Sequence, residues 1–152
     1  MGRRVVITGV GLVSPVGLGT EQTWQALLAG KGGVAPITHF DASRFSCRIA
    51  AEVKGFDPLD WIEKKEVKKM GRFIHLAIAA GDFAMQMAGL QVNGENSERI
   101  GVYVSSGIGG FDVIEREHKV LLESGPRRIS PYFNPGTNIN LAAGHQSIRY
   151  SA

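Results

Sequence analysis

The sequence predicts a layered α/β fold with a mainly parallel sheet. Two segments rich in β-branched residues, 3–8 and 99–105, are each followed by a glycine-rich loop and then by a stretch with helical periodicity. Strands that alternate with helices along the chain are typical of parallel sheets covered by helices. Glycine accounts for 20 of the 152 residues, nearly double the usual ~7%. This excess indicates tight turns and close backbone contacts.

The first half of the chain begins with the predicted strand at 3–8, which leads into a loop punctuated by glycines. Thr20 has the right chemistry to cap the helix that follows, and Gly30 can end that helix. A short strand is predicted at 49–53. Residues 57–58, an Asp-Pro pair, are typical of a helix start and lead into a basic segment.

The second half of the chain is mainly helical in its patterning. Apolar residues recur every three or four positions over 70–90, which predicts a long helix with one wide buried face. The predicted strand at 99–105 and a second glycine-rich loop follow. Helices are then expected over about 111–123 and over 138–147, where small residues permit close packing. No repeat or linker divides the chain, so one domain is expected.

Composition excludes several classes of protein. Hydrophobic residues make up 43% of the chain and charged residues 20%, which excludes a disordered tail. No apolar run approaches the ~18 residues of a membrane-spanning helix, and the N-terminus has no signal-peptide pattern. The single cysteine excludes an intrachain disulfide and fits a reducing compartment. We therefore expect a cytoplasmic protein that does not associate with a membrane.

The net charge of +3 is concentrated in one short segment. Residues 63–72 hold five basic and two acidic side chains, a sum of +3, so the rest of the chain is balanced. Spacings of three and four residues would bring these charges to one side of a helix. The segment is either a solvated helix face or a docking surface for an acidic protein; the balanced surroundings argue against nucleic acid. The basic residues are Lys64, Lys65, Lys68, Lys69 and Arg72.

The residues alone assemble no catalytic or metal centre. Cys47 is the only thiol, and no strand-glycine-helix elbow presents it as a nucleophile. The histidines show no metal-ligand spacing and have no cysteine cluster beside them. We therefore expect structural or surface roles for them, and we expect no metal site. These histidines are His39, His75, His118 and His145.

The glycine loops match a nucleotide-binding motif only in part. The first loop reads Gly9-x-Gly11-x-x-Ser14 and lacks the third glycine, and Pro15 stands where a helix should already be running. The second loop, 107–110, also lacks the full spacing. Turns that allow close packing are the favoured interpretation, and a nucleotide-binding α/β domain stays open as an alternative.

Six stretches, spread from residue 3 to residue 150, together carry a family resemblance. They are Arg-Arg-Val-Val-Ile-Thr-Gly-x-Gly-x-x-Ser-Pro-x-Gly at 3–17, Trp-x-x-Leu-Leu-x-Gly at 24–30, Lys-x-x-Lys-Lys-Met at 65–70, Ser-Gly-Ile-Gly-Gly at 106–110, Pro-Arg-Arg-Ile-Ser-Pro-Tyr-Phe-x-Pro at 126–135 and Ala-Gly-His-x-Ser-Ile-Arg-Tyr at 143–150. Together they resemble the N-terminal part of an elongating β-ketoacyl-acyl carrier protein synthase of type II fatty acid synthesis.

This resemblance implies a thiolase-like layered α/β fold of two pseudo-repeated halves, of which this chain is part of the N-terminal half only. It implies a homodimer and an acyltransferase that condenses malonyl-carrier protein with acyl-carrier protein, with loss of CO2. The partners implied are acyl carrier protein and fatty acyl and malonyl thioesters. No cofactor is implied for the chain itself, because the 4'-phosphopantetheine is carried by the acyl carrier protein.

The resemblance places the catalytic groups outside this chain. The family's cysteine nucleophile follows shortly after the match to Arg149 and Tyr150, and its two catalytic histidines lie further on. Residues 1–152 are therefore expected to be an N-terminal synthase segment, truncated before the nucleophile elbow and inactive alone. Cys47 and the four histidines match none of these positions. The alternative is a non-catalytic module that binds the carrier protein or a partner subunit.

Some functional positions of the family do match this sequence. The resemblance implies a docking patch for acyl carrier protein at Lys65, Lys68 and Lys69. It implies an acyl-pocket position at Ile108, and an aromatic near the dimer interface at Phe133 with Thr137 nearby. Ordinary core packing is the alternative for Ile108 and Phe133.

Overall fold

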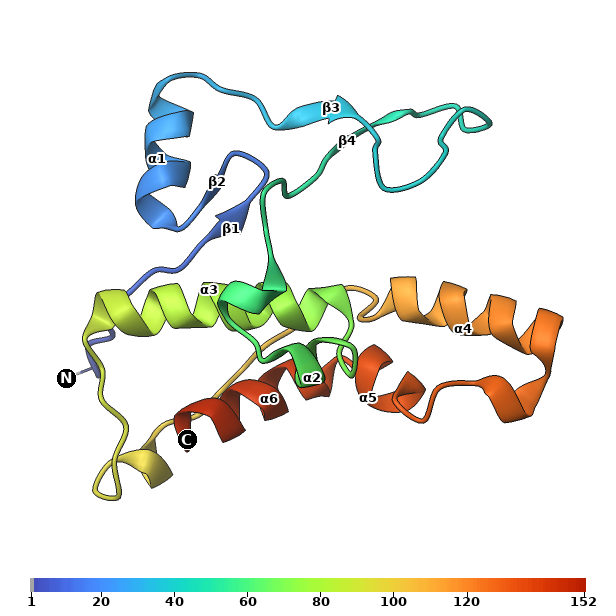
Figure 1. Ribbon diagram of the computed structural model, residues 1–152. Helices are drawn as coiled ribbons and strands as arrows, with labels where there is room; N and C mark the ends of the chain where they lie inside the picture. The colour runs from blue at the N-terminus through green and yellow to red at the C-terminus, as the bar shows by residue number, and fades with distance from the viewer. Residues whose placement is uncertain (1) are drawn as a thin grey trace. The chain divides into compact units, whose positions relative to one another are not determined.

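The computed structural model describes residues 2–152, which form two compact units (Figure 1). The first unit comprises residues 2–57 and 82–89, and the second comprises 58–81 and 90–152. Helix α3 (Arg72–Ala88) contributes its first part to the second unit and its last part to the first.

The first unit begins with a small hairpin and a helix. Strands β1 (Val13–Ser14) and β2 (Gly17–Leu18) pair antiparallel and lead into α1 (Thr20–Leu28). The prediction that Thr20 caps this helix is wrong, because its hydroxyl donates to the carbonyl of Val10 at 2.6 Å. The backbone of Gly19 takes the N-cap position instead, at a φ of 91° that favours glycine.

A second hairpin completes the first unit. Strands β3 (Val34–Pro36) and β4 (Ile49–Ala51) pair antiparallel, which confirms a strand within 49–53. The buried carboxylate of Glu52 follows β4 and accepts hydrogen bonds from the backbone N–H and hydroxyl of Thr38 and from the N–H of His39. This carboxylate holds the loop after β3 against the end of β4.

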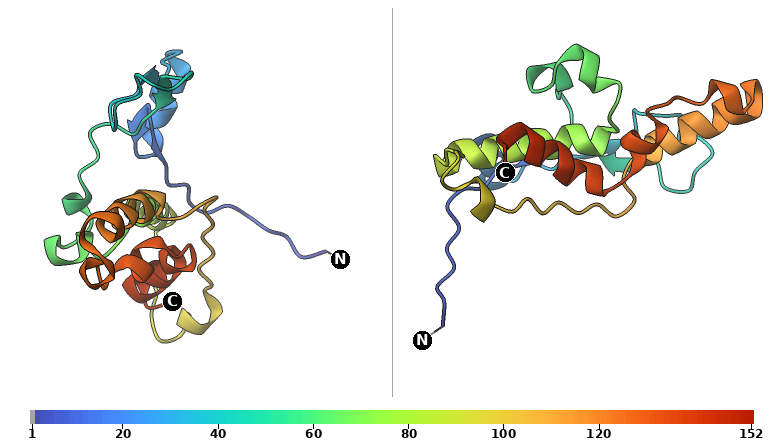
Figure 2. Two further views of the ribbon diagram at one scale, coloured as in Figure 1. Left: turned by 90° about the vertical axis from the view of Figure 1, so that its right-hand side faces the viewer. Right: turned by 90° about the horizontal axis from the view of Figure 1, so that it is seen from below.

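The predicted strands at 3–8 and 99–105 are not strands in the structure. The side chains of Val5, Ile7 and Tyr103 are 91%, 85% and 95% exposed, and the extended segment near the N-terminus lies beside no other strand (Figure 2). Both sheets found within residues 2–152 are two-stranded and antiparallel. A parallel strand gains its hydrogen bonds and burial from neighbouring strands, and no described residues supply them.

Short and long helices build the second unit. The three longer helices predicted at 70–90, 111–123 and 138–147 are confirmed. The basic segment, by contrast, is helical over only four residues and then turns. In addition to the first part of α3, the second unit contains η1 (Pro58–Asp60), α2 (Lys64–Val67), η2 (Ser97–Arg99), α4 (Phe111–Ser124), η3 (Pro126–Arg128), α5 (Phe133–Thr137) and α6 (Asn140–Tyr150).

The core of the second unit lies where α6 runs alongside the first part of α3 (Figures 1 and 2). Ile74 and Ala142 are completely buried there, and Ile62 and Ile78 complete the cluster. The buried Gln146 side chain donates from Nε2 to the carbonyl of Ala77 at 2.6 Å. Apolar burial and one satisfied buried amide therefore join the two helices.

Glu52 is expected to make the β3–β4 hairpin sensitive to acid. Hydrogen bonds from Thr38, and further from His39, lower the pKa of Glu52 from 4.5 to about 2. The folded state favours the charged carboxylate, so its contribution is complete above pH 4.5 and is lost as the pH falls from 4.5 towards about 2. We expect Glu52→Gln to weaken the hairpin at neutral pH and to flatten this dependence.

Chemical denaturation at several pH values, followed through the amide NMR signals of Thr38 and His39, measures this effect. Glu21→Gln is the control, because Glu21 lies exposed on α1 and accepts a hydrogen bond from the side chain of Gln25, four residues further along the same helix. An equal effect of the two substitutions would contradict the prediction.

Candidate functional site

The basic segment, residues 63–72, lies on the surface of the second unit, and its apolar side chains pack against the core of that unit. The side chains of Val67 and Met70 pack against the core. The buried His75 of α3 lies with Nε2 2.9 Å from the carbonyl oxygen of Val67, the last residue of α2. With its apolar side held, the segment exposes Lys64, Lys65 and Lys68 to solvent.

Two lysines of the segment are held in ion pairs. Lys65 Nζ lies 2.8 Å from Glu63 Oε2, with both side chains more than 70% exposed. Lys69 Nζ lies 2.7 Å from Glu66 Oε1, with only 33% and 32% of these side chains exposed. The hydrogen bond that each lysine donates to its glutamate raises the pKa of that lysine. Lys69 also lies 5.7 Å from the centre of the Tyr132 ring.

The other lysines of the segment keep their charge unpaired. Lys64 and Lys68 are exposed, and no carboxylate within residues 2–152 forms an ion pair with either. The structure therefore brings the three predicted docking positions onto one short segment but gives them different environments. Lys68 is open, Lys65 is paired in solvent, and Lys69 is paired and half-buried.

The glycine-rich loop at 106–110 packs directly onto α5. Gly110 donates its N–H to the carbonyl of Thr137 at 3.1 Å, and Gly109 donates to the hydroxyl of Ser106 at 3.0 Å. Gly109 has a φ of 79°, and a Cβ at Gly110 would collide with the carbonyl oxygen of Gly136. Gly109 and Gly110 are therefore required for close backbone contact, the favoured interpretation from the sequence.

Two of the three predicted acyl-pocket residues share one groove. Ile108 and Thr137 line an open groove of about 570 Å³, together with Val104, Ile114 and Ile139. Thr137 is buried, whereas the side chain of Ile108 is 64% exposed. Ile108 is therefore not a core residue in the structure but a wall of the groove.

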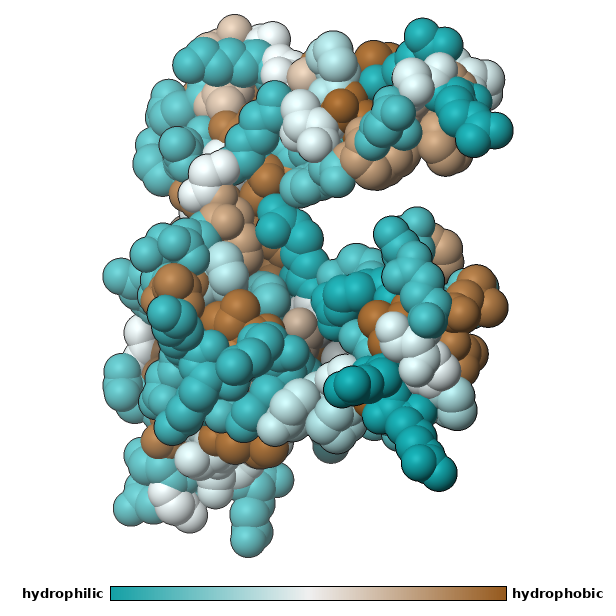
Figure 3. Space-filling view, turned by 45° about the vertical axis from the view of Figure 1, so that its right-hand side comes forward, coloured by the Kyte–Doolittle hydropathy of each residue, from teal (hydrophilic) through white to brown (hydrophobic). Residues whose placement is uncertain are grey.

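Phe133 lies in a different cavity from Ile108 and Thr137. It lines a smaller, apolar cavity of about 260 Å³ on α4, with Leu121 and Ile129, and Ile114 borders both cavities. Beside it, the buried carboxylate of Glu117 accepts a hydrogen bond from the N–H of Ser130 at 2.8 Å, which lowers the pKa of Glu117. Apolar side chains also reach the surface over α4 (Figure 3).

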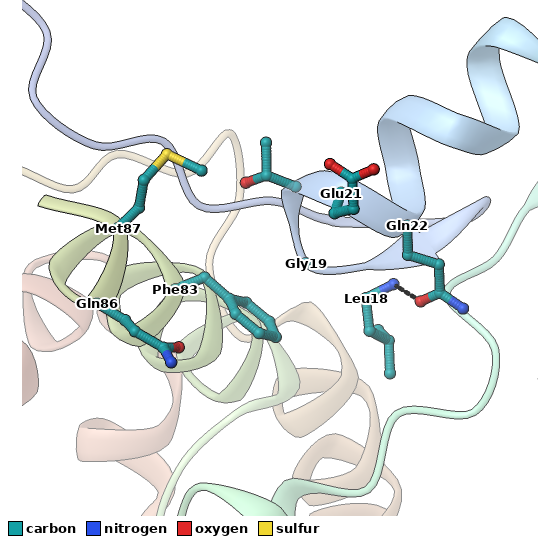
Figure 4. A pocket seen from close by; sticks show the side chains of 8 residues that line it. Leu18, Gly19, Glu21, Gln22, Phe83, Gln86 and Met87 are labelled. Atoms are coloured by element: carbon teal, nitrogen blue, oxygen red, sulfur yellow. Dashed lines mark hydrogen bonds between the residues drawn. The ribbon is translucent and has the colours of Figure 1, made fainter.

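A pocket in the first unit is one that the sequence did not predict (Figure 4). It has a volume of about 600 Å³ and lies between the start of α1 and the last part of α3. Leu18 and the Phe83 ring face it, and Leu18 donates its N–H to the side-chain oxygen of Gln22 at 2.7 Å. A Cβ on Gly19 would lie 3.4 Å from the Phe83 ring. Gly19, in the first glycine-rich loop, was the one feature of the sequence that could have indicated this pocket.

The remaining candidate residues form no reactive centre. Cys47 is exposed, its thiol lies 3.6 Å from the carbonyl oxygen of Ile49, and no histidine side chain in the described chain hydrogen-bonds to it. Burial lowers the pKa of His75 and of His145. Across residues 2–152, no three His, Cys, Asp or Glu side chains are arranged to hold a metal ion. Nor does any helix in this range combine the length and the apolar character needed to cross a membrane.

The first glycine-rich loop does not have the geometry of a nucleotide-binding turn. It folds into the β1–β2 hairpin instead of joining a strand to a helix. A Cβ at Gly9 would collide with the backbone of Ala84 and Ala88 in α3. This glycine therefore serves close packing.

The sequence is similar to a known family over nearly its whole length. Residues 2–152 match the family model described as "Beta-ketoacyl synthase, N-terminal domain". The chain is 52% identical over 146 residues to the 3-oxoacyl-[acyl-carrier-protein] synthase 2 of Vibrio cholerae and 51% identical over 148 residues to that of Coxiella burnetii. These alignments cover 96% and 97% of this chain but 35% and 36% of the relatives. The chain thus spans about a third of their length.

Solved ketosynthase structures match the fold. The ishigamide ketosynthase/chain length factor superposes with a TM-score of 0.81 at 31% identity, covering 97% of this chain and 37% of that one. A β-ketoacyl synthase from Burkholderia phymatum gives a TM-score of 0.78 at 30% identity, covering 98% and 37%. A type II polyketide ketosynthase in complex with its acyl-carrier protein gives 0.75 at 25%, covering 96% and 38%. The predicted fold class, an incomplete thiolase-like α/β fold, is confirmed.

Gly110→Ala is expected to disturb the groove through the backbone. The new methyl group has no room beside the carbonyl of Gly136, so the loop must move away from α5. Overpacking of this kind costs about 1–3 kcal/mol of unfolding free energy. We expect a lower midpoint of denaturation and shifted NMR signals for Thr137. Gly107→Ala is the control, because open space surrounds Gly107 in the same loop; equal effects of the two would refute the prediction.

Proposed function

The chain belongs to the β-ketoacyl synthase family, and from that membership we propose that it is the N-terminal segment of a 3-oxoacyl-acyl carrier protein synthase of fatty acid synthesis. The observation that carries this proposal is the 52% identity to a 3-oxoacyl-[acyl-carrier-protein] synthase 2 over 96% of the chain. In the complete synthase, an acyl chain is transferred from its carrier to a cysteine. Malonyl-carrier protein then loses CO2 and attacks the thioester.

In this proposal the basic segment docks acyl carrier protein through Lys65, Lys68 and Lys69. Support comes from the placement of these lysines on a short surface segment whose apolar side is anchored in the core. A local patch of one sign of charge steers an oppositely charged protein and orients it on arrival. The solved complex of a related ketosynthase with its acyl-carrier protein is consistent with such a partner.

The groove lined by Ile108 and Thr137 is proposed as part of the wall of the fatty acyl site. Its lining is rich in branched apolar side chains, which suit an acyl chain. Phe133 is assigned to the neighbouring apolar cavity on α4, where it would reach towards the second subunit of a homodimer. The exposed apolar side chains on α4 support burial of this region in an assembly.

The chain itself supplies no catalytic residue in this proposal. We assign the cysteine nucleophile and the two catalytic histidines to residues beyond Tyr150 in the complete synthase, so that 1–152 precedes the nucleophile elbow. The substrates are acyl and malonyl thioesters on the 4'-phosphopantetheine of the carrier protein, and the chain needs no cofactor of its own. We further propose that it works in the cytoplasm, without membrane or nucleic acid partners.

A second candidate function is a non-catalytic module that binds acyl carrier protein or a partner subunit. The observation that favours it is the contrast between the two kinds of site in this chain. Of the lysines proposed for docking, Lys65 and Lys68 are exposed and Lys69 is partly exposed, whereas Cys47 has no histidine hydrogen-bonded to it within residues 2–152. Carrier binding without condensation would be the behaviour of such a module.

The 152-residue chain alone is expected to form no 3-oxoacyl product from acyl-carrier protein and malonyl-carrier protein. Its one thiol, Cys47, lacks the adjacent base that nucleophilic catalysis requires. Mass spectrometry of the carrier-bound products measures this directly. Product above the level of a Cys47→Ser control would overturn the assignment of catalysis to other residues.

Lys65→Glu combined with Lys69→Glu is expected to weaken binding of acyl carrier protein at least about tenfold at low salt, because two attractive charges become repulsive. Titration by fluorescence anisotropy measures the Kd. The matched control is Lys31→Glu with Lys54→Glu, which makes the same change of net charge at two exposed lysines elsewhere in the chain. Equal losses in both variants, or none in either, would count against the docking assignment.

A further inference from the structure

The lysines of the basic segment differ in how much of their charge is available to an acidic partner. Lys64 and Lys68 stand in solvent with no carboxylate of residues 2–152 paired to them. Lys65 and Lys69 are already bound to carboxylates of the same segment, Glu63 and Glu66. An incoming carboxylate therefore meets two free cations and two occupied ones.

The two internal ion pairs also differ in strength. The Glu63–Lys65 pair is almost fully solvated, and pairs of this kind contribute little and are screened by salt. The Glu66–Lys69 pair has only about a third of each side chain exposed, so less water competes with it. Lys69 is further held over the Tyr132 ring. Glu66 therefore competes more strongly for Lys69 than Glu63 does for Lys65 when a carboxylate of a partner approaches.

We propose that Glu66 is a specificity-determining residue, an internal competitor that an acidic carrier protein must displace from the Lys69 ammonium. This inference rests on the carrier docking proposed above. Lys64 and Lys68 make the first, long-range attraction, and Lys69 changes partners as the complex tightens. A partner with a single acidic side chain satisfies the open lysines but does not release Lys69. A partner with a cluster of carboxylates does both, so the exchange selects carboxylate-rich surfaces.

Glu66→Gln isolates this effect. The amide keeps the size and a hydrogen-bonding oxygen but removes the negative charge that competes for Lys69. Glu98→Gln is the matched control, since it makes the same change of net charge at an exposed residue of the same unit. Glu98 lies in η2, the yellow segment of Figure 1, away from α2.

The readout is the Kd of the 152-residue chain for purified acyl carrier protein, measured at low and at high salt. We expect Glu66→Gln to lower the Kd about threefold at low salt, an effect of the size measured for single ion pairs. Glu98→Gln should leave the Kd unchanged, and high salt should reduce the difference between the variants.

An unchanged or higher Kd for Glu66→Gln, or an equal decrease in both variants, overturns the role of Glu66. If the Lys65→Glu and Lys69→Glu variant loses binding while Glu66→Gln is neutral, docking stands and only this inference fails. If the unsubstituted chain does not bind the carrier at all, the docking proposal fails, and the role of Glu66 fails with it.

A second measurement tests the internal competition without any partner. Glu66 raises the pKa of Lys69, so its removal is expected to lower that pKa in an NMR titration of the lysine side chains. Lys65, whose main partner is Glu63, should change much less. An unchanged pKa of Lys69 in the Glu66→Gln variant would show that the two groups do not compete, and would overturn the inference independently of binding.

Discussion

The packing of α6 on the first part of α3 is the interaction on which the second unit depends. Ile74 and Ala142 are fully buried at this contact, and the small alanine allows the helices to approach closely. Gln146 closes the contact with a hydrogen bond to the carbonyl of Ala77. Among the described residues, every buried polar side-chain atom has a hydrogen-bond partner. The elements that carry the proposed function are attached to this pair of helices.

The basic segment at the surface is held in place by contacts with the core. Val67 and Met70 pack at the edge of the core, and the ring of His75 lies against the last turn of α2. Because the backbone of the segment is held from the inside, its charged side chains are presented outwards. The helical spacing of the basic residues predicted a surface feature, and Lys64, Lys65 and Lys68 are exposed. The single helix face it implied was wrong, since α2 ends at Val67 and the chain turns before α3 begins.

Close backbone contact explains part of the glycine excess. Gly71 and Gly110 both approach the carbonyl of Gly136, at a point where neither has room for a Cβ. This contact joins the glycine-rich loop to α5 and sets one side of the groove between Ile108 and Thr137. The backbone contact of this loop therefore helps to shape the proposed acyl site. Phe133, by contrast, lines a separate cavity on α4.

The sequence by itself determined the long helices and the position of the basic segment, because helical periodicity and charge are local properties of the chain. The motifs also identified the family. The strands predicted at 3–8 and 99–105 were wrong, since a strand depends on hydrogen bonds and burial supplied by neighbours in space. Only the tertiary structure decided that Ile108 and Thr137 share a groove, that Phe133 does not, and that Lys69 is paired while Lys68 is free. These are relations between residues whose distances depend on how the helices and loops pack.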